Sequence, residues 1–377
     1  MTVAAGLPAP PPYGSGTLAD VLPSVAAGLG VPGFHDLLGL GDADRVVVLL
    51  VDGLGARLLR AHTDAAPFLS SLPSAVPALS APFPSTTPAG LGSLGTGLPP
   101  GGHGLVGQSF RVPEWGRTLW PLGWKDEPNP VATQPEPTVL ERAGAAGVAV
   151  SSVSPRAFQD SGLTRAVLRG TDYRGADSIG ERVGEVVGAV RAGDRSLVYA
   201  YWGDLDRTGH VHGVDSDHWR ADLAVADLLA ARIADTLPPG AVMYVTADHG
   251  MVDCPDDRRV DLDADPRLRE GVASLAGEPR ARHVYAQRGA ADDVLAAWSE
   301  VLGDAAWVVS RDDAVAAGWF GETMPEYDDR IGDVVAVARD DVALASVRTD
   351  SLISGLRGQH GSLTPVEVEI PLLAVRA

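Results

Sequence analysis

Five short segments of the chain contain the residue types that bind divalent metals. Each carries a carboxylate, an imidazole or a hydroxyl, and the five lie far apart in the sequence. Together they supply enough ligands for two cations and leave one hydroxyl that could attack phosphorus. The candidates are Asp52 in VVVLLVDG, Thr87 in FPSTTPAG, Asp206 and His210 in DLDRTGHVHG, Asp248 and His249 in VTADHG, and His360 in GQHGS.

Each segment taken alone also has a simpler structural explanation. Asp52 precedes a glycine, as in an ordinary turn after a strand. Thr86 or Thr87 could cap a helix that has Pro88 in its first turn. The same helix start would suit an anionic phosphoryl group, because its N–H groups and dipole favour negative charge. It is the presence of all five segments in this order that indicates a bimetallic site.

Two of the segments place an acid close to an imidazole. Asp206 and His210 are four residues apart, and we expect them to bind one ion from a shared loop. Asp248 and His249 are adjacent at the end of a predicted strand. Neighbouring side chains on an extended backbone point in opposite directions, so these two could serve different ions.

Other polar and aromatic residues near the segments receive supporting assignments. We expect Asp204 and His212 to lie on the surface or behind the ligands, and we give His103 no ligand role. An aromatic cluster in one stretch could stack on a base, although packing of a lid is the commoner use of such residues. The cluster contains Phe110, Trp115, Trp120 and Trp124.

The composition excludes some functions and constrains others. The 377 residues suffice for one large or two ordinary domains, and the net charge of −19 argues against binding to nucleic acid or an anionic membrane. An acidic protein repels phosphate esters, so bound metals would have to reverse the charge locally. Cys254 is the only cysteine, which excludes an intramolecular disulfide and a thiolate metal cluster.

Apolar runs alternate with helical stretches, which predicts an α/β fold with a mostly parallel central sheet and helices on both faces. The β-branched run Val46–Val51 is typical of a strand buried on both faces. Further strands are predicted at AVPALSA (75–81), GVAVSSV (147–153), SLVYAYW (196–202), AVMYVTA (241–247), His283–Ala286, Trp307–Ser310, Asp333–Ala338 and Ile370–Val375. Helices are predicted at Thr17–Leu29, Ile179–Val190 and His218–Ala234.

We expect one catalytic domain over residues 41–377, with insertions or a cap at about 108–137 and 252–345. Residues 1–40 would form a flexible or extended lead (1–16) and a short helix. Asp52, Asp206 and Asp248 each follow a predicted strand, and the carboxyl ends of parallel strands share one crevice. No lysine or arginine precedes Arg45, and no apolar run approaches the length of a membrane span. The sequence therefore predicts a cytoplasmic protein.

Read together, the segments resemble the nucleotide pyrophosphatase/phosphodiesterase family of the alkaline phosphatase superfamily, over about Val46 to Leu373. The VDG, the threonine before a helix, the D-x-x-G-H-x-x-G segment, ADHGM and a late HG occur in the family's order. The resemblance implies an alkaline-phosphatase-like fold and hydrolysis of phosphodiesters or pyrophosphates through a phospho-threonine. It also implies that one zinc is bound by Asp52, Thr87, Asp248 and His249, and the other by Asp206, His210 and His360.

One position departs from the family pattern. Family members commonly have an asparagine three residues after the nucleophile, where it helps to hold a phosphate oxygen, and this chain has Gly90. We expect a backbone N–H at Gly90 to take over that contact, or the substrate to differ from a nucleotide. The arginine found beside the nucleophile of monoester phosphatases has no counterpart near Thr87, which favours diesters.

Three readings of the function stay open at this point. The first is a phosphodiesterase or nucleotide pyrophosphatase that acts on small phosphate esters with two zinc ions, for which manganese or iron could substitute. The second keeps the fold and makes the protein a phosphomonoesterase or phosphonate hydrolase. The third is a metal-stabilised binding protein without turnover.

Overall fold

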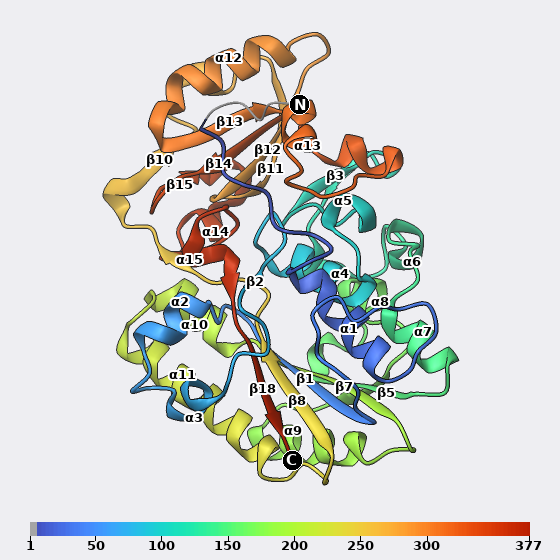
Figure 1. The fold of residues 1–377 in the computed structure, drawn as a ribbon. Coiled ribbons are helices and arrows are strands. Elements are labelled where there is room, and N and C mark those ends of the chain that lie inside the picture. The colour runs from blue at the N-terminus through green and yellow to red at the C-terminus, as the bar shows by residue number, and fades with distance from the viewer. Residues whose placement is uncertain (1–5) are drawn as a thin grey trace.

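The computed structural model describes residues 6–377, and its largest element is a six-stranded sheet in the order β18-β8-β1-β7-β5-β6. Five strands are parallel, and β18 pairs antiparallel with β8 at one edge. The sheet crosses the lower half of the molecule in Figure 1. Its strands are β1 (Arg45–Val51), β5 (Ala149–Ser154), β6 (Asp172–Gly175), β7 (Ser196–Trp202), β8 (Ala241–Thr246) and β18 (Leu372–Arg376).

Strand β1 is the centre of the sheet, as its β-branched sequence predicts. Val46–Val51 are buried, and β1 pairs in parallel with β7 on one side and β8 on the other. In this register Val48 lies opposite both Tyr199 and Tyr244. The predicted α/β class with a mainly parallel sheet is confirmed.

Helices cover both faces of the sheet (Figure 1). On one face α9 (Ile179–Val190) contacts β1, β5 and β7 and packs on α11 (Asp217–Ala234). Ser178 caps α9 and forms a reciprocal capping box with Glu181, and Ser216 caps α11. The other face carries α1 (Val21–Gly28), α4 (Thr87–Thr96), α7 (Val139–Ala145) and α8 (Gly162–Val167).

The stretch 252–345, predicted as an insertion, contains a second sheet with its own core. This antiparallel sheet has the order β11-β12-β14-β13 and packs against α12 (Ala291–Leu302) at the top of Figure 1. Three of its strands correspond to predicted ones, and β11 was not predicted. Their bounds are β11 (Val272–Glu278), β12 (Ala281–Ala286), β13 (Ala306–Ser310) and β14 (Val334–Ala338).

Two predicted strands are wrong in extent, and proline is the cause in both. In the segment 75–81 only β2 (Leu79–Ser80) is a strand, and it pairs with β17 (Glu369–Ile370) outside the main sheet. Pro77 has no N–H to give to a sheet. Pro371 likewise divides the predicted strand 370–375 into β17 and β18.

The amino-terminal region packs against the rest of the protein. Of the predicted lead, residues 1–5 lie outside the described range. Residues 6–16 contain no helix or strand, and the Trp307 and Trp319 indoles donate hydrogen bonds to the Gly6 and Pro8 carbonyls. The predicted helix at 17–29 is a 3₁₀ turn, Leu18–Asp20, followed by α1, and Thr17 caps the turn.

The stretch 108–137 forms the hairpin β3 (Phe110–Val112) and β4 (Arg117–Leu119), followed by α6 (Pro130–Thr133). The remaining short helices and strands lie between the larger elements. They are α2 (Ala56–Ala61), α3 (Pro67–Ser71), α5 (Pro100–His103), β9 (Val252–Asp253), α10 (Asp204–His212), β10 (Arg259–Asp261), α13 (Arg311–Ala316), β15 (Ala343–Ala345), α14 (Val347–Ser354), β16 (Gly358–Gln359) and α15 (Pro365–Val368).

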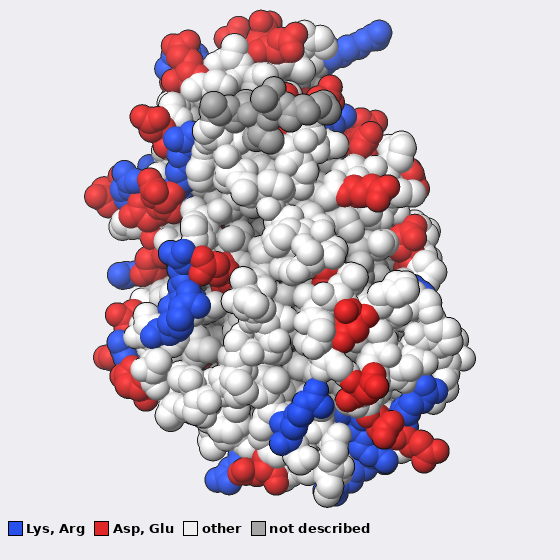
Figure 2. All heavy atoms as spheres, viewed as in Figure 1, with Lys and Arg blue, Asp and Glu red and all other residues white. Residues whose placement is uncertain are grey.

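Within residues 6–377, every helix is too short or too polar to cross a membrane. Acidic and basic side chains are interspersed on the face that Figure 2 displays.

Candidate active site

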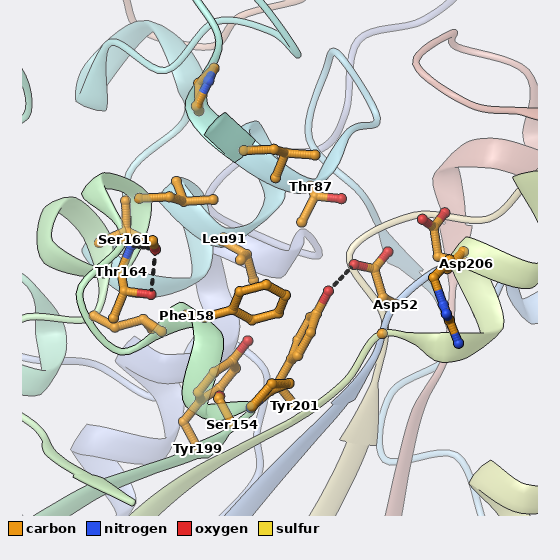
Figure 3. Close-up of a pocket in the computed structure, with 18 of the residues that line it drawn as sticks. Asp52, Thr87, Leu91, Ser154, Phe158, Ser161, Thr164, Tyr199, Tyr201 and Asp206 are labelled. Atoms are coloured by element: carbon orange, nitrogen blue, oxygen red, sulfur yellow. Dashed lines mark hydrogen bonds between the residues drawn. The ribbon is translucent and has the colours of Figure 1, made fainter. Parts of the chain in front are cut away.

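All seven predicted ligands lie together at the carboxyl end of the parallel strands. Asp52 directly follows β1, Asp248 follows β8, and α10 with Asp206 follows β7. Thr87 is the first residue of α4, and Figure 3 shows its hydroxyl directed toward the carboxylates of Asp52 and Asp206. Close approach of parallel strand ends thus brings together residues from five distant segments.

One cluster consists of Asp52, Asp248 and His249, with Thr87 beside it. The Nε2 atom of His249 lies 3.4 Å from Asp52 Oδ1 and 3.5 Å from Asp248 Oδ2. The Thr87 Oγ1 atom is 3.3 Å from the same nitrogen. All four side chains are buried, so the hydroxyl lies within a pre-formed set of possible metal ligands.

A second cluster consists of Asp206, His210 and His360. His210 Nε2 is 3.3 Å from Asp206 Oδ2, and His360 Nε2 is 3.7 Å from Asp206 Oδ1. The imidazole of His360 also stacks on that of His249, with 3.7 Å between ring centroids. The two clusters are therefore neighbours.

The hydrogen bonds of the three imidazoles fit metal ligands. Each Nδ1 lies within 3.0 Å of a main-chain carbonyl oxygen, that of Ser85 for His360, Gly358 for His210 and Gly250 for His249. A carbonyl only accepts, so each Nδ1 carries the proton and each Nε2 presents a lone pair.

These lone pairs face one another and face unpaired carboxylate oxygens. His210 Nε2 and His360 Nε2 are 3.2 Å apart, a repulsive contact for two neutral rings with protonated Nδ1. One buried oxygen each of Asp52, Asp206 and Asp248 has no hydrogen-bond partner among residues 6–377. Buried polar atoms are rarely left unsatisfied, and a divalent cation in each cluster would satisfy these.

The charges of the protein alone are unfavourable here. Burial raises the pKa of Asp52 well above its usual range, and the charges of Asp248 and Asp206 raise it further. Burial likewise raises the pKa of Asp248. Burial, with the neighbouring imidazoles of His249 and His210, lowers the pKa of His360 well below its usual range. A bound cation would favour ionised carboxylates and neutral imidazoles.

One detail of the predicted geometry is wrong, and a second had been left open between two arrangements. Asp206 and His210 lie on helix α10 and not on a loop, and one helical turn brings them to the same face. Asp248 and His249 join one cluster, because the chain bends after β8 and Asp248 Oδ1 accepts hydrogen bonds from the His249 and Gly53 N–H groups. Adjacent residues in a bend need not diverge as they do in a strand.

Gly90 lies behind the site, and its N–H is already used. The N–H donates to the Thr86 carbonyl within the helix, so the expected backbone contact with a phosphate oxygen is not available from it. A Cβ atom at Gly90 would lie 2.7 Å from Asp248 Cβ. The glycine thus allows α4 to approach Asp248.

Three polar residues given no ligand role lie outside the two clusters. His103 is buried behind α4, where its ring lies 3.1 Å from Ser93 Oγ, and His212 stacks on His218 at 3.9 Å. Asp204 pairs with Arg207.

The three tryptophans of the stretch 108–137 do not form one wall, which was the less favoured of the two uses considered for them. Trp124 is buried and donates to the Pro128 carbonyl, whereas Trp120 is 49% exposed. Trp115 is partly buried and contacts Arg117 instead. The three side chains therefore have separate environments.

A pocket of about 340 Å³ adjoins Thr87 and Asp52 (Figure 3). Its walls are mostly apolar and its aromatic residues come from β7 and the 3₁₀ turn Arg156–Phe158. Sequence reasoning missed this pocket. The sequence did contain one signal for it. Tyr199 and Tyr201 are two residues apart on one strand, so their side chains lie on the same face of the sheet. Its apolar and aromatic lining is Leu91, Pro121, Leu122, Pro155, Phe158, Leu163, Val167, Leu168, Tyr199 and Tyr201.

Two residues that support the ligands were also missed. The Tyr201 hydroxyl donates a hydrogen bond to Asp52 Oδ2. The Ser85 carbonyl oxygen accepts a hydrogen bond from His360 Nδ1. The Ser85 hydroxyl donates a hydrogen bond to the Ser362 carbonyl and accepts one from the Gly361 N–H. No pattern in the sequence distinguishes such contacts, since they depend on chain segments far apart.

Comparison with known proteins identifies the family. The family model described as type I phosphodiesterase/nucleotide pyrophosphatase matches residues 46–363, so the chain belongs to this family and is a phosphoric ester hydrolase. This confirms the resemblance found in the sequence. No curated protein sequence matches the chain closely enough to count as a relative.

Solved structures with the same fold include two kinds of enzyme. Murine ectonucleotide pyrophosphatase/phosphodiesterase 5 is 20% identical with a TM-score of 0.70, covering 88% of each chain. An inactive threonine-to-alanine variant of that protein was solved with AMP (TM-score 0.67, 20% identity, 88% of this chain and 87% of that one). Phosphonoacetate hydrolase from Sinorhizobium meliloti 1021, in complex with phosphonoformate, has a TM-score of 0.68 at 20% identity, covering 89% of this chain and 91% of that one.

Proposed function

We propose that this protein hydrolyses nucleotide-type phosphodiesters or pyrophosphates, with Thr87 as nucleophile and two divalent metal ions as cofactors. The observation that carries the proposal is the arrangement of unpaired ligand atoms around the Thr87 hydroxyl. Three imidazole lone pairs and three unpaired carboxylate oxygens converge beside it. Burying such a set of polar atoms costs free energy unless bound cations compensate it.

In the proposed reaction Thr87 Oγ1 forms a bond to phosphorus as the bond to the first leaving oxygen breaks. Water then cleaves the phospho-threonine and restores the hydroxyl. Asp52, Asp248 and His249 would hold one cation with Thr87, and Asp206, His210 and His360 the other. When bound, the cations would acidify the hydroxyl and the water and neutralise charge on the phosphoryl group. The mixed nitrogen and oxygen ligands favour zinc over manganese or iron.

The neighbouring pocket supports a diester over a small phosphonate. Two arginines line the pocket, and both already make contacts, although the Arg182 Nε atom has no hydrogen-bond partner among the described residues. Arg182 donates to the Tyr201 and Ala176 carbonyls, and Arg207 pairs with Asp204. Apolar walls suit an uncharged organic group on the ester instead. The cytoplasmic location remains a prediction from the sequence.

The test is turnover of bis-p-nitrophenyl phosphate, p-nitrophenyl phosphate and phosphonoacetate by the wild type, Thr87→Ala and Thr87→Ser, with metal content measured by elemental analysis. We expect two metals per chain, a preference for the diester, and a fall of about 10³-fold or more for Thr87→Ala with metal retained. Thr87→Ser keeps a hydroxyl and should retain more activity.

Each contrary outcome points to a different reading. Undiminished turnover by fully metallated Thr87→Ala would remove Thr87 from its role. A preference for the monoester would indicate a phosphomonoesterase. Hydrolysis of phosphonoacetate alone would indicate a phosphonate hydrolase. A fully metallated wild type inactive on all three compounds would favour the binding protein.

A further inference from the structure

An ion pair lies beside the second ligand cluster, and the proposed reaction gives it no role. Helix α10 carries Asp206 of that cluster. Asp204 and Arg207 lie on the same helix, and both line the pocket that Thr87 borders. The Arg207 Nη2 atom is 3.1 Å from Asp204 Oδ1. The pair is therefore within the space that a substrate occupies.

The Arg207 side chain is free to change its partner. It is 73% exposed and the Asp204 side chain is 46% exposed, and in the described part of the chain Asp204 is the one carboxylate that pairs with Arg207. An exposed ion pair of this kind contributes little to stability, because water screens it and two side chains must be held in place. A more highly charged anion could therefore replace Asp204 as the partner.

Arg182, the second arginine that lines the pocket, is held in place. It is 4% exposed, and its guanidinium stacks on Trp202 at 4.6 Å. Its η nitrogens donate hydrogen bonds to the Tyr201 and Ala176 carbonyls, and its Nε has no partner among residues 6–377. The charge of Arg182 adds to the positive potential of the pocket, but its guanidinium would lose both bonds if it turned toward a ligand. Arg207 is thus the mobile one of the two cations.

The carboxylates that line the pocket are offset in different ways. Asp52 and Asp206 are candidate metal ligands, so a cation in each cluster would offset their charge. Asp204 belongs to neither cluster, and Arg207 offsets it instead. The protein has a net charge of −19, which repels an anionic substrate at long range. Local cations must therefore compensate for that repulsion at the site.

The position of the pair indicates which part of the substrate it meets. Thr87 lies beside the first cluster, and in-line displacement sends the leaving group away from the attacking oxygen. In Figure 3 Asp206 lies on the side of Thr87 that faces away from Phe158 and the apolar wall. The leaving group would therefore depart along α10, where Arg207 lies.

We propose that Arg207 is a specificity-determining residue, whose guanidinium binds an anionic leaving group such as the diphosphate of a nucleoside triphosphate, and that Asp204 competes for this guanidinium. The inference rests on the proposed function, since Thr87 must form the bond to the α-phosphorus. The bond from this phosphorus to the bridging oxygen then breaks, and diphosphate leaves with the electron pair while the hydroxyl proton passes to solvent. Arg207 contacts the departing phosphate oxygens and takes no part in making the new bond.

Two substrates that transfer the same group test the inference. Thymidine 5′-triphosphate releases diphosphate, and the p-nitrophenyl ester of thymidine 5′-monophosphate releases p-nitrophenol. For Arg207→Gln we expect kcat/KM on the triphosphate to fall about tenfold to hundredfold, the size of a lost hydrogen bond to a charged group. The aryl ester should change less than about twofold. The fall on the triphosphate should shrink as ionic strength rises.

Asp204→Asn should act in the opposite direction, because it releases Arg207. We expect kcat/KM on the triphosphate to rise about twofold to fivefold, the size of an exposed ion pair, with the aryl ester nearly unchanged. The rise should shrink in an Arg207→Gln background, since it depends on the guanidinium. An equal rise in both backgrounds would overturn the role given to Asp204.

Arg232→Gln is the matched control. Arg232 forms the same kind of pair with Asp235, three residues further along the chain, at the end of α11 and outside the pocket. Its loss should affect neither substrate. Metal content is measured for every variant, because Arg207 adjoins Asp206 and loss of metal would slow both substrates equally.

The inference is overturned if Arg207→Gln leaves both substrates unchanged or slows both equally, or if the wild type cleaves the aryl ester but not the triphosphate. A wild type that cleaves neither substrate would instead contradict the proposed function. The two failures are therefore distinguishable.

Discussion

At the scale of single residues, the site depends on groups that hold the ligands as much as on the ligands. Main-chain carbonyls hold the Nδ1 atoms of His210, His249 and His360, which directs each Nε2 inward. The Tyr201 hydroxyl likewise holds the Asp52 carboxylate in place, because it donates a hydrogen bond to Asp52 Oδ2. Such contacts fix the orientation of a ligand before a cation binds.

Tyr201→Phe should therefore weaken metal binding while keeping the ring in the pocket. We expect zinc affinity to fall about 10-fold to 100-fold, the usual cost of removing a group that orients a ligand. Competition with a chromogenic chelator measures this, with Tyr244→Phe as the control, because the Tyr244 hydroxyl donates to the Leu40 carbonyl instead. Equal affinities for wild type and Tyr201→Phe would show that Asp52 needs no help from this hydroxyl.

At the scale of elements, helix α4 carries the nucleophile and approaches its neighbours closely at its glycines. Cβ atoms at Gly90, Gly92 and Gly95 would meet Asp248, the His103 ring and the Val167 carbonyl at 2.7, 2.4 and 2.0 Å. Glycine lowers helix propensity, so this sequence gives up local stability for close packing. The consequence is that Thr87 at the helix start lies beside the ligands that follow β8.

Gly90→Ala should be destabilising although alanine is the better helix former. The gain in propensity is about 1 kcal/mol, whereas overpacking typically costs about 1–3 kcal/mol. We expect a lower free energy of unfolding and less bound metal, because Asp248 must shift.

Gly180→Ala in α9 is the matched control, since a Cβ there meets nothing within 4 Å. It should stabilise the protein by up to about 1 kcal/mol. If Gly90→Ala behaved like Gly180→Ala in chemical denaturation and metal content, close packing at Gly90 would not matter.

At the scale of the whole molecule, the two sheets meet through buried charged groups behind the site. Glu278, at the end of β11, accepts a hydrogen bond from the Gln108 N–H at 3.0 Å, and its other oxygen has no partner in the part of the chain that the structure describes. Burial raises the pKa of Glu278 to about 8. Arg280 and Glu367 form a buried ion pair nearby, which joins the second sheet to the segment after His360.

The raised pKa makes stability depend on pH. The folded state retains the Glu278 proton over a range where the unfolded chain has lost it, so this contribution is complete below the usual pKa of 4.5 and is lost as pH rises through about 8. Glu278→Gln removes the titration. We expect the stability difference between variant and wild type to grow by at most about 1.4 kcal/mol per pH unit across this interval. Denaturant titrations from pH 5 to 8 measure it, and parallel curves would contradict it.

The sequence alone determined the fold class, the positions of most main strands along the chain and the choice of seven candidate ligands. Those properties are local: β-branched runs such as Val46–Val51 form buried strands, and parallel strands end at one edge. The tertiary structure decided what local pattern cannot encode, namely the distances within the two ligand clusters, the close contact at Gly90 and the pocket of Tyr199 and Tyr201. These features depend on distances between segments up to three hundred residues apart, and such distances are set by packing of the whole chain.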